Sequence, residues 1–119
     1  MLVADISEDA VSETVRLVAA DRVSAFQMDV TATATVENMV AETIMRYGRL
    51  DYAFNNSGIP GRVDTTTIDY EEEDWDRVIA VDPKSVWLCI KYEIRQMLKQ
   101  GGGAVINTAS IAGLVGLVG

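Results

Sequence analysis

The chain has 119 residues, of which 49% are hydrophobic and 24% charged, so it can build one domain around one core and is too hydrophobic for a disordered chain. Its net charge of −8 repels nucleic-acid phosphates and anionic lipid headgroups, and we expect neither nucleic acid nor a membrane as a partner. The lack of His excludes Ser-His-Asp hydrolysis and metal sites with His ligands, and the single Cys excludes an internal disulfide. Low Cys usage is typical of proteins of the cytoplasm.

The first half of the chain alternates short β-branched segments with longer segments of helical period. Ser7 is a candidate N-cap, because its side-chain oxygen can accept a hydrogen bond from a free N–H of the following helix. Gly48 is typical of a residue that ends a helix as its C-cap. The predicted elements are a strand over 2–4 that Asp5 stops, a helix over 8–20, a strand over 23–28 and a helix over 33–47.

The second half contains the longest predicted helix, which begins with four acidic residues that suit the positive end of the helix dipole. Three consecutive glycines end it. Its apolar face is predicted to consist of Trp75, Val78, Ile79, Val86, Cys89, Ile90 and Met97. The predicted elements are a strand over 50–54, a turn over 55–58, an exposed loop over 59–70, the helix over 71–99 and a strand over 104–107.

This alternation of strands and helices predicts a parallel sheet with right-handed helical crossovers. The expected fold is an α/β three-layer sandwich, Rossmann-like or flavodoxin-like, with about four strands in a single domain over 1–119. Ligands of such sheets bind beyond the carboxyl ends of the strands. The polar groups that close the predicted strands all fall on that edge. The alternative is that they are ordinary loop residues, since loops carry polar residues in any protein. These groups are Asp5, Asp29, Asn55-Asn56 and Thr108 to Ser110.

Two carboxylates close the first two predicted strands. Asp5 could accept both hydroxyls of an adenosine ribose and would repel a 2′-phosphate, or it could simply cap the turn that follows. Asp29 and Val30 could present a carboxylate and a backbone N–H to an adenine edge, or Asp29 could cap the segment from Thr31 onward.

The turn after the third predicted strand is rich in amides. Asn55 and Asn56 could lock neighbouring strand ends together, and Gly58 would let the backbone approach a ligand closely. The alternative is an ordinary Asn-rich turn.

Four segments together resemble the short-chain dehydrogenase/reductase family in order and spacing. The third matches the family's Asn-Asn-Ala-Gly motif with Ser57 in place of Ala, and the fourth matches its Asn-x-Ser-Ser strand with Ala109 at the first Ser. The resemblance runs from residue 1 to residue 119. The four segments are Leu2-Val3-Ala4-Asp5-Ile6, Asp29-Val30-Thr31, Leu50 to Ile59 and Gly103 to Gly113.

The resemblance implies a doubly wound sheet that binds NAD(H) or NADP(H) and passes hydride between the nicotinamide and an alcohol or carbonyl carbon. Ser110 would be the catalytic serine that hydrogen-bonds the substrate oxygen; the alternative is a cap after the last strand. The charge of Asp5 favours NAD over NADP. The implied cofactor contacts are Asp5 and Ile6 at the ribose, Asp29 and Val30 at the adenine, and Asn56, Ser57 and Gly58 beneath the cofactor.

Two parts of the family pattern do not occur in the sequence. There is no Gly-x-x-x-Gly-x-Gly phosphate loop, and no Tyr has a Lys four residues later, so the family's general acid/base and its partner are missing. We therefore expect the central part of a longer enzyme, which alone would be inactive.

The long helix departs from the family within the chain. Asp82 stands where the family has its catalytic Asn, and keeps a hydrogen-bond acceptor while losing the amide donor. Pro83 is expected to clash with the preceding helical turn at a cost of roughly 3 kcal/mol unless the helix is already kinked there. Ser85 replaces a Gly and adds bulk where packing is close.

Three hypotheses follow. The first is a cytoplasmic, NAD-preferring enzyme part that acts on an alcohol or ketone and forms a homo-oligomer through the helix over 71–99, as the family does. The second is a naturally short module that binds a nucleotide or dimerises without catalysis. The third is an unrelated flavodoxin-like module, which leaves the four matching segments to chance.

Overall fold

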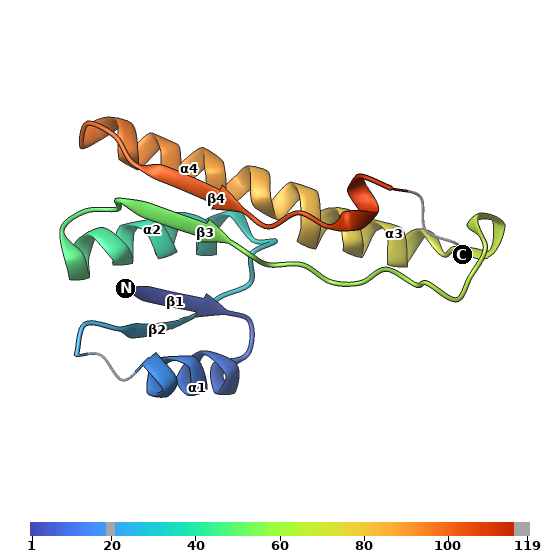
Figure 1. The fold of residues 1–119 in the computed structure, drawn as a ribbon, viewed down its shortest axis with the longest axis horizontal. Coiled ribbons are helices and arrows are strands. Elements are labelled where there is room, and N and C mark those ends of the chain that lie inside the picture. The colour runs from blue at the N-terminus through green and yellow to red at the C-terminus, as the bar shows by residue number, and fades with distance from the viewer. Residues whose placement is uncertain (19–20, 116–119) are drawn as a thin grey trace.

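A computed structural model of the chain describes residues 1–18 and 21–115. Strands and helices alternate along it, as the sequence pattern predicts (Figure 1). No helix in the described ranges has the length and apolar content that crossing a membrane requires. The elements are β1 (Leu2–Asp5), α1 (Glu8–Val18), β2 (Ser24–Gln27), α2 (Thr33–Tyr47), β3 (Tyr52–Asn55), α3 (Glu72–Ile79), α4 (Ser85–Lys99) and β4 (Ala104–Asn107).

The four strands form two short parallel sheets. β1 pairs with β2, and β3 pairs with β4, with Asn55 opposite Asn107 at the carboxyl end of the second pair. β1, β3 and β4 run in the same direction in Figure 1. The expected α/β fold is therefore present as a partial version, in which the described residues build two parallel pairs rather than one continuous sheet.

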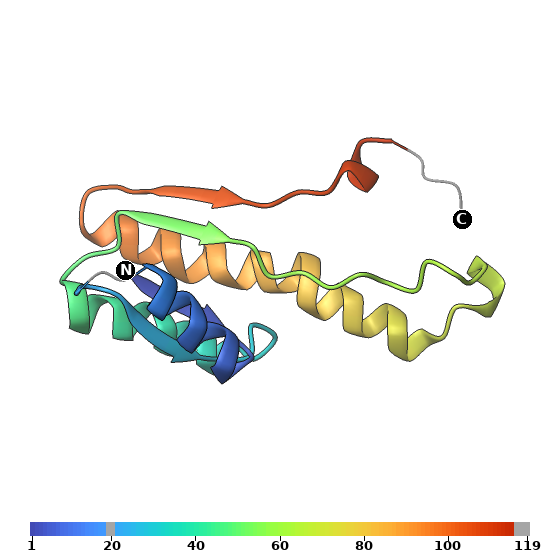
Figure 2. The same cartoon turned by 60° about the horizontal axis from the view of Figure 1, so that its bottom comes forward.

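Helices cover both faces of the β1–β2 sheet. α1 packs on one face through Val11, which is 1% exposed. α2 and α4 pack against each other on the other side, where α4 also lies against β3 and β4, and this gives the three expected layers (Figures 1 and 2). The core between them contains Met28, Val36, Leu88 and Cys89, and partly buried Ala4, Phe26, Val30, Met39 and Tyr92 pack around it.

The predicted single helix over 71–99 is divided by a π-helical turn, Ala80–Lys84, that contains Pro83. A π turn is wider than an α turn, so it accommodates the proline ring without the clash expected in a regular helix. The hydroxyl of Ser85, which is 1% exposed, donates to the carbonyl of Val81. The side chain that replaces the family's Gly is thus buried and hydrogen-bonded.

The buried face of the long helix differs in part from the predicted one. Cys89 and Met97 are buried as expected, but Trp75 and Ile79 are 60% and 38% exposed. The expectation that these two lie on the buried apolar face was therefore wrong, because among the described elements α3 packs mainly against the π turn and little else covers its surface. Glu93, midway between Cys89 and Met97 at spacings of four, lies on the buried face instead and is 2% exposed.

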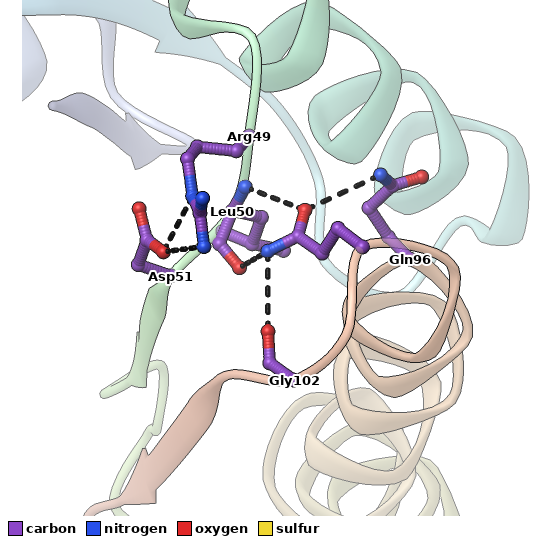
Figure 3. A network of polar contacts seen from close by, with 6 residues as sticks. Arg49, Leu50, Asp51, Gln96 and Gly102 are labelled. Atoms are coloured by element: carbon purple, nitrogen blue, oxygen red, sulfur yellow. Dashed lines mark hydrogen bonds and ion pairs between the residues drawn. The ribbon is translucent and has the colours of Figure 1, made fainter.

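A polar network ties the end of α4 to the start of β3 (Figure 3). The side-chain amide of Gln100 donates to the carbonyl of Leu50 at 2.6 Å and accepts from the Leu50 N–H at 3.0 Å. Arg49 and Asp51 form an ion pair beside it at 2.7 Å. These contacts fix the amino-terminal edge of the β3–β4 sheet, while the predicted site lies at the opposite edge.

Candidate functional site

Paired amides join the carboxyl ends of β3 and β4. The Nδ2 of Asn55 donates to Oδ1 of Asn107 at 3.0 Å, and the Thr108 N–H donates to the Asn55 carbonyl at 2.9 Å. The Thr108 hydroxyl donates to Oδ1 of Asn56 at 2.6 Å. This geometry confirms the interpretation that the two Asn side chains lock neighbouring strand ends together.

Asp82 connects the π turn to the loop that follows β3. Its Oδ1 accepts the N–H of Ile59 at 2.9 Å, and a Cβ built on Gly58 would lie 3.7 Å from the same oxygen. Asp82 therefore retains the acceptor that the sequence indicated and uses it to hold the Asn-Asn-Ser-Gly turn. Its part in catalysis stays a prediction.

Ser110 lies three residues after β4 and is exposed. Its Oγ accepts the N–H of Ala112 at 3.2 Å and so caps the short 3₁₀ helix Ile111–Gly113. This is the capping role that the sequence offered as the alternative. The contact uses an oxygen lone pair and leaves the hydroxyl proton available to a substrate oxygen, so the catalytic role also stays a prediction.

The carboxylates that close β1 and β2 also make local caps. Oδ1 of Asp5 accepts the Ser7 N–H at 2.9 Å, and Oδ1 of Asp29 accepts the Thr31 N–H at 2.8 Å. Both residues are exposed, and their Oδ2 atoms take no part in these bonds. One oxygen of each carboxylate thus supports the local backbone, and the other is not used in this cap.

The neighbours of these carboxylates differ in exposure. Ile6 is 67% exposed, and its carbonyl accepts Nε2 of Gln27 at 3.1 Å. Val30 is half-buried against the core, so its backbone, rather than its side chain, would face a ligand. Asn56, Ser57 and Gly58 are exposed on the turn after β3.

The predicted site residues therefore form two groups at the carboxyl ends of the strands. Hydrogen bonds join Asn56 and the Gly58 turn to β4 and to Asp82. Asp5, Ile6, Asp29 and Val30 form the second group at the ends of β1 and β2. The backbone N–H of Met28 donates to the Asp5 carbonyl at 2.9 Å and holds this second group together.

Sequence reasoning missed Glu93, whose Oε2 accepts Nδ2 of Asn55 at 3.0 Å. Burial raises the pKa of the Glu93 carboxyl, and the Asn55 hydrogen bond offsets part of this rise. Burial, followed by the charge of Glu93, raises the pKa of the Cys89 thiol to about 11. The spacing of four between Cys89, Glu93 and Met97 was the signal that placed a carboxylate on the buried face.

Known proteins share both the sequence and the fold. The family model described as short chain dehydrogenase matches residues 1–119. An uncharacterized oxidoreductase of Thermotoga maritima is 39% identical over 115 residues, which cover 95% of this chain and 44% of the relative. Cyclohexanol dehydrogenase of an Acinetobacter species is 44% identical over 88 residues, covering 71% of this chain and 35% of the relative.

Solved structures give the same result. The crystal structure of levodione reductase superposes with a TM-score of 0.88 at 33% identity, covering 98% of this chain and 46% of that protein. An actinorhodin polyketide ketoreductase variant with NADPH superposes with a TM-score of 0.89 at 28% identity, with coverages of 98% and 46%. The chain thus spans less than half the length of these relatives. The family match over all 119 residues, on a fold with locked parallel strand ends, shows that the chain belongs to the short-chain dehydrogenase family.

Proposed function

We propose that this chain is the central part of an oxidoreductase that interconverts an alcohol and a carbonyl with a nicotinamide cofactor. The observation that carries the proposal is the pair of cross-strand contacts, Asn55 to Asn107 and Thr108 to Asn56, at the carboxyl ends of β3 and β4. They bring the Asn-Asn-Ser-Gly turn next to the strand end that leads to Ser110. Ligands of parallel α/β sheets bind at this edge.

The donor set at this edge fits such a cofactor. Asp5 and Asp29 are exposed, and their Oδ2 atoms would suit ribose hydroxyls and an adenine amine, with Ile6 and the Val30 backbone beside them. Gly58 lies with Asn56 and Ser57 on an exposed turn, and a glycine there would let a ligand approach the backbone closely. The cofactor supplies or accepts a hydride when it is bound. The assigned role of Ser110 is to donate its hydroxyl proton to the substrate oxygen and so orient and polarise it.

We propose that the chain alone does not turn over substrate, because no Tyr in it has a Lys four residues later and the family's proton transfer therefore has no donor. The test is the rate of NADH oxidation or NAD reduction with a panel of small alcohols and ketones. A rate above buffer that Ser110→Ala abolishes would contradict the proposal.

Nucleotide binding by the chain tests the proposed role of the turn over 55–58. Titration of the chain with NAD and NADP, followed by calorimetry, should show binding that Gly58→Val weakens, because a branched side chain there would push against the Asp82 carboxylate that holds the turn. Gly113→Val is the matched control, since its added Cβ has no atom within 4 Å and lies outside the turn. Equal binding by the two variants would contradict the assignment of the turn.

We propose NAD as the preferred cofactor on the charge of Asp5, although similar solved proteins hold NADP or NADPH. The carboxylate would repel a 2′-phosphate. Asp5→Ala should therefore narrow the difference in dissociation constant between the two cofactors. An unchanged ratio would remove the basis for NAD preference.

We also propose that two copies of the chain associate through the segment over 71–99. The support is a row of exposed apolar side chains along α3 and α4, in which Trp75, Trp87 and Leu98 are 60%, 56% and 75% exposed. The same row supports the alternative of a dimerising module without catalysis. Light scattering should report a dimer that Trp87→Glu converts to a monomer, while Val63→Glu, at an 84% exposed position in the loop, leaves it intact.

The remaining proposals follow from composition. The single Cys supports a cytoplasmic location, and the net charge of −8 disfavours nucleic-acid and membrane partners.

A further inference from the structure

Glu93 is a buried carboxylate that the proposed reaction does not use. It is 2% exposed on the face of α4 that carries Cys89 and Met97, both of which pack as apolar residues. Burial of a carboxylate is unfavourable unless hydrogen bonds compensate for the lost water, so an aliphatic side chain would fill this position at a lower cost in free energy. The contact that Glu93 makes therefore needs an explanation beyond packing.

That contact fixes the orientation of the Asn55 amide. The two Nδ2 protons of Asn55 point to two acceptors, Oε2 of Glu93 and Oδ1 of Asn107, each at 3.0 Å. The Asn55–Asn107 pair alone could form in either direction, because each amide has both donors and an acceptor. Oε2 of Glu93 is the acceptor in this contact, so Glu93 selects one arrangement, with the NH₂ group of Asn55 turned towards α4 and β4.

The fixed amide lies between the two strand ends that carry the predicted site. Asn55 directly precedes Asn56, Ser57 and Gly58, and its carbonyl accepts the Thr108 N–H at 2.9 Å. Asn107 and Thr108 lead in turn to Ser110. A rotation of the Asn55 amide would break the Asn107 contact and loosen both turns.

We infer that Glu93 is a positioning residue, which orients Asn55 and through it aligns the cofactor turn with the strand end that carries Ser110. The inference rests on the proposed function for what the two turns bind. The alignment itself is tested without nucleotide, so its failure can be told apart from failure of the proposed function.

The experiment measures amide hydrogen exchange and side-chain amide NMR signals of the 119-residue chain. Thr108 N–H reports the site end of the strand pair, and Ala104 N–H, which donates to the Asp51 carbonyl at 2.9 Å, reports the opposite end. Glu93→Leu should speed exchange at Thr108 roughly tenfold relative to Ala104 and shift the Asn55 side-chain signals, since loss of one hydrogen bond to a charged group is of that order. General destabilisation would speed exchange at both ends equally.

Two further variants separate orientation from packing. Glu93→Gln keeps a carbonyl acceptor and should leave the ratio of the two exchange rates within about twofold of the unmodified chain. Leu88→Met changes a buried apolar side chain of α4 in the core with Met28 and Val36, and should leave the ratio unchanged. An unchanged ratio in Glu93→Leu, or an equal change in Leu88→Met, would overturn the inference.

A donor–acceptor exchange keeps the test decisive if Glu93→Leu does not fold. Asn55→Asp alone would place two carboxylates together, whereas Asn55→Asp with Glu93→Gln restores a donor facing an acceptor in the opposite direction. The double variant should recover cooperative unfolding and slow exchange at Thr108 compared with Asn55→Asp. No recovery would mean that the contact between the two side chains does not set the alignment.

If the aligned chain binds neither NAD nor NADP while the exchange results hold, the proposed function fails and the positioning role of Glu93 stands. If the chain binds a nucleotide but the exchange difference is absent, the proposed function stands and the positioning role of Glu93 fails.

Discussion

Replacement of Asp82 by Ala tests whether one side chain holds the π turn to the loop after β3. The half-buried Oδ1 accepts the Ile59 N–H at 2.9 Å, and a hydrogen bond to a charged group contributes about 1.5–3 kcal/mol to stability. Asp82→Ala removes this bond and leaves the N–H without that acceptor, so we expect the free energy of unfolding to fall by about 2 kcal/mol.

Urea denaturation followed by far-UV circular dichroism measures this loss. With a urea dependence of about 1–3 kcal/mol per molar for a small protein, a loss of about 2 kcal/mol moves the midpoint down by roughly 1 M. Asp82→Asn keeps an acceptor oxygen, so its loss should be less than about 1 kcal/mol.

Asp76→Ala is the matched control, because Asp76 is exposed in α3 and its removal changes the net charge by the same amount. The difference between Asp82→Ala and Asp76→Ala is the contribution of the Ile59 contact. If the two variants unfold at midpoints within about 0.2 M of each other, a gap far below the shift of roughly 1 M worked out above, Asp82 does not hold the loop.

Three more outcomes follow from the structure. Pro83→Leu should change the free energy of unfolding by less than about 1 kcal/mol, because the π turn already accommodates the proline ring. A gain of about 3 kcal/mol in urea denaturation would show instead that the proline is strained. The pKa of Glu93 is raised in the folded chain, so the unfolded chain loses this proton at lower pH, and the free energy of unfolding should fall as the pH rises above about 4.3, the ordinary pKa of Glu. Glu93→Gln should flatten this part of the plot of unfolding free energy against pH. An unchanged slope would contradict the raised pKa of Glu93. Val36→Ala, at a fully buried position, should lower the free energy of unfolding by about 2 kcal/mol, and Val63→Ala, at an 84% exposed position, by less than about 0.5 kcal/mol. Equal thermal midpoints for the two variants would refute the described core.

The sequence predicted the elements well because their limits depend on local chemistry. Ser7 accepts the Ala10 N–H at 3.3 Å as a cap, and Gly48 ends α2 with a φ of 83° and an N–H that donates to the Ile44 carbonyl. Caps and turns of this kind are set by residues within four positions of each other. They can therefore be recognised in one sequence without knowledge of the fold.

Predictions that depended on the phase of the long helix were less successful. Pro83 indicated a disturbance but not a π turn, and the exposure of Trp75 and Ile79 reflects how little of the described chain packs on α3, which a periodic pattern does not show. Glu93 was missed for a related reason, since a charged residue is normally placed on the solvent side of a helix. Its partner Asn55 is 38 residues away, and no local pattern shows a contact at that separation.

The predicted site was partly recoverable because strand ends of a parallel fold meet at one edge. That rule brought the amides of Asn55 and Asn107 together correctly. It did not reveal that Asp5, Asp29 and Ser110 would each use an oxygen to cap the local backbone as well. The two uses are compatible, because a carboxylate or hydroxyl oxygen can accept from the backbone and still contact a ligand.

The division of the strands into two parallel pairs has a practical consequence for work with the isolated chain. Each described strand has a neighbour on one side only, so a row of backbone N–H and C=O groups faces outward along each pair. Such open edges are templates for adding strands from other molecules, and the exposed aromatic side chains of Tyr52 and Phe54 on β3 strengthen this tendency. Aggregation of the purified chain should therefore rise steeply with concentration, and a lysine introduced in place of Phe54 should suppress it.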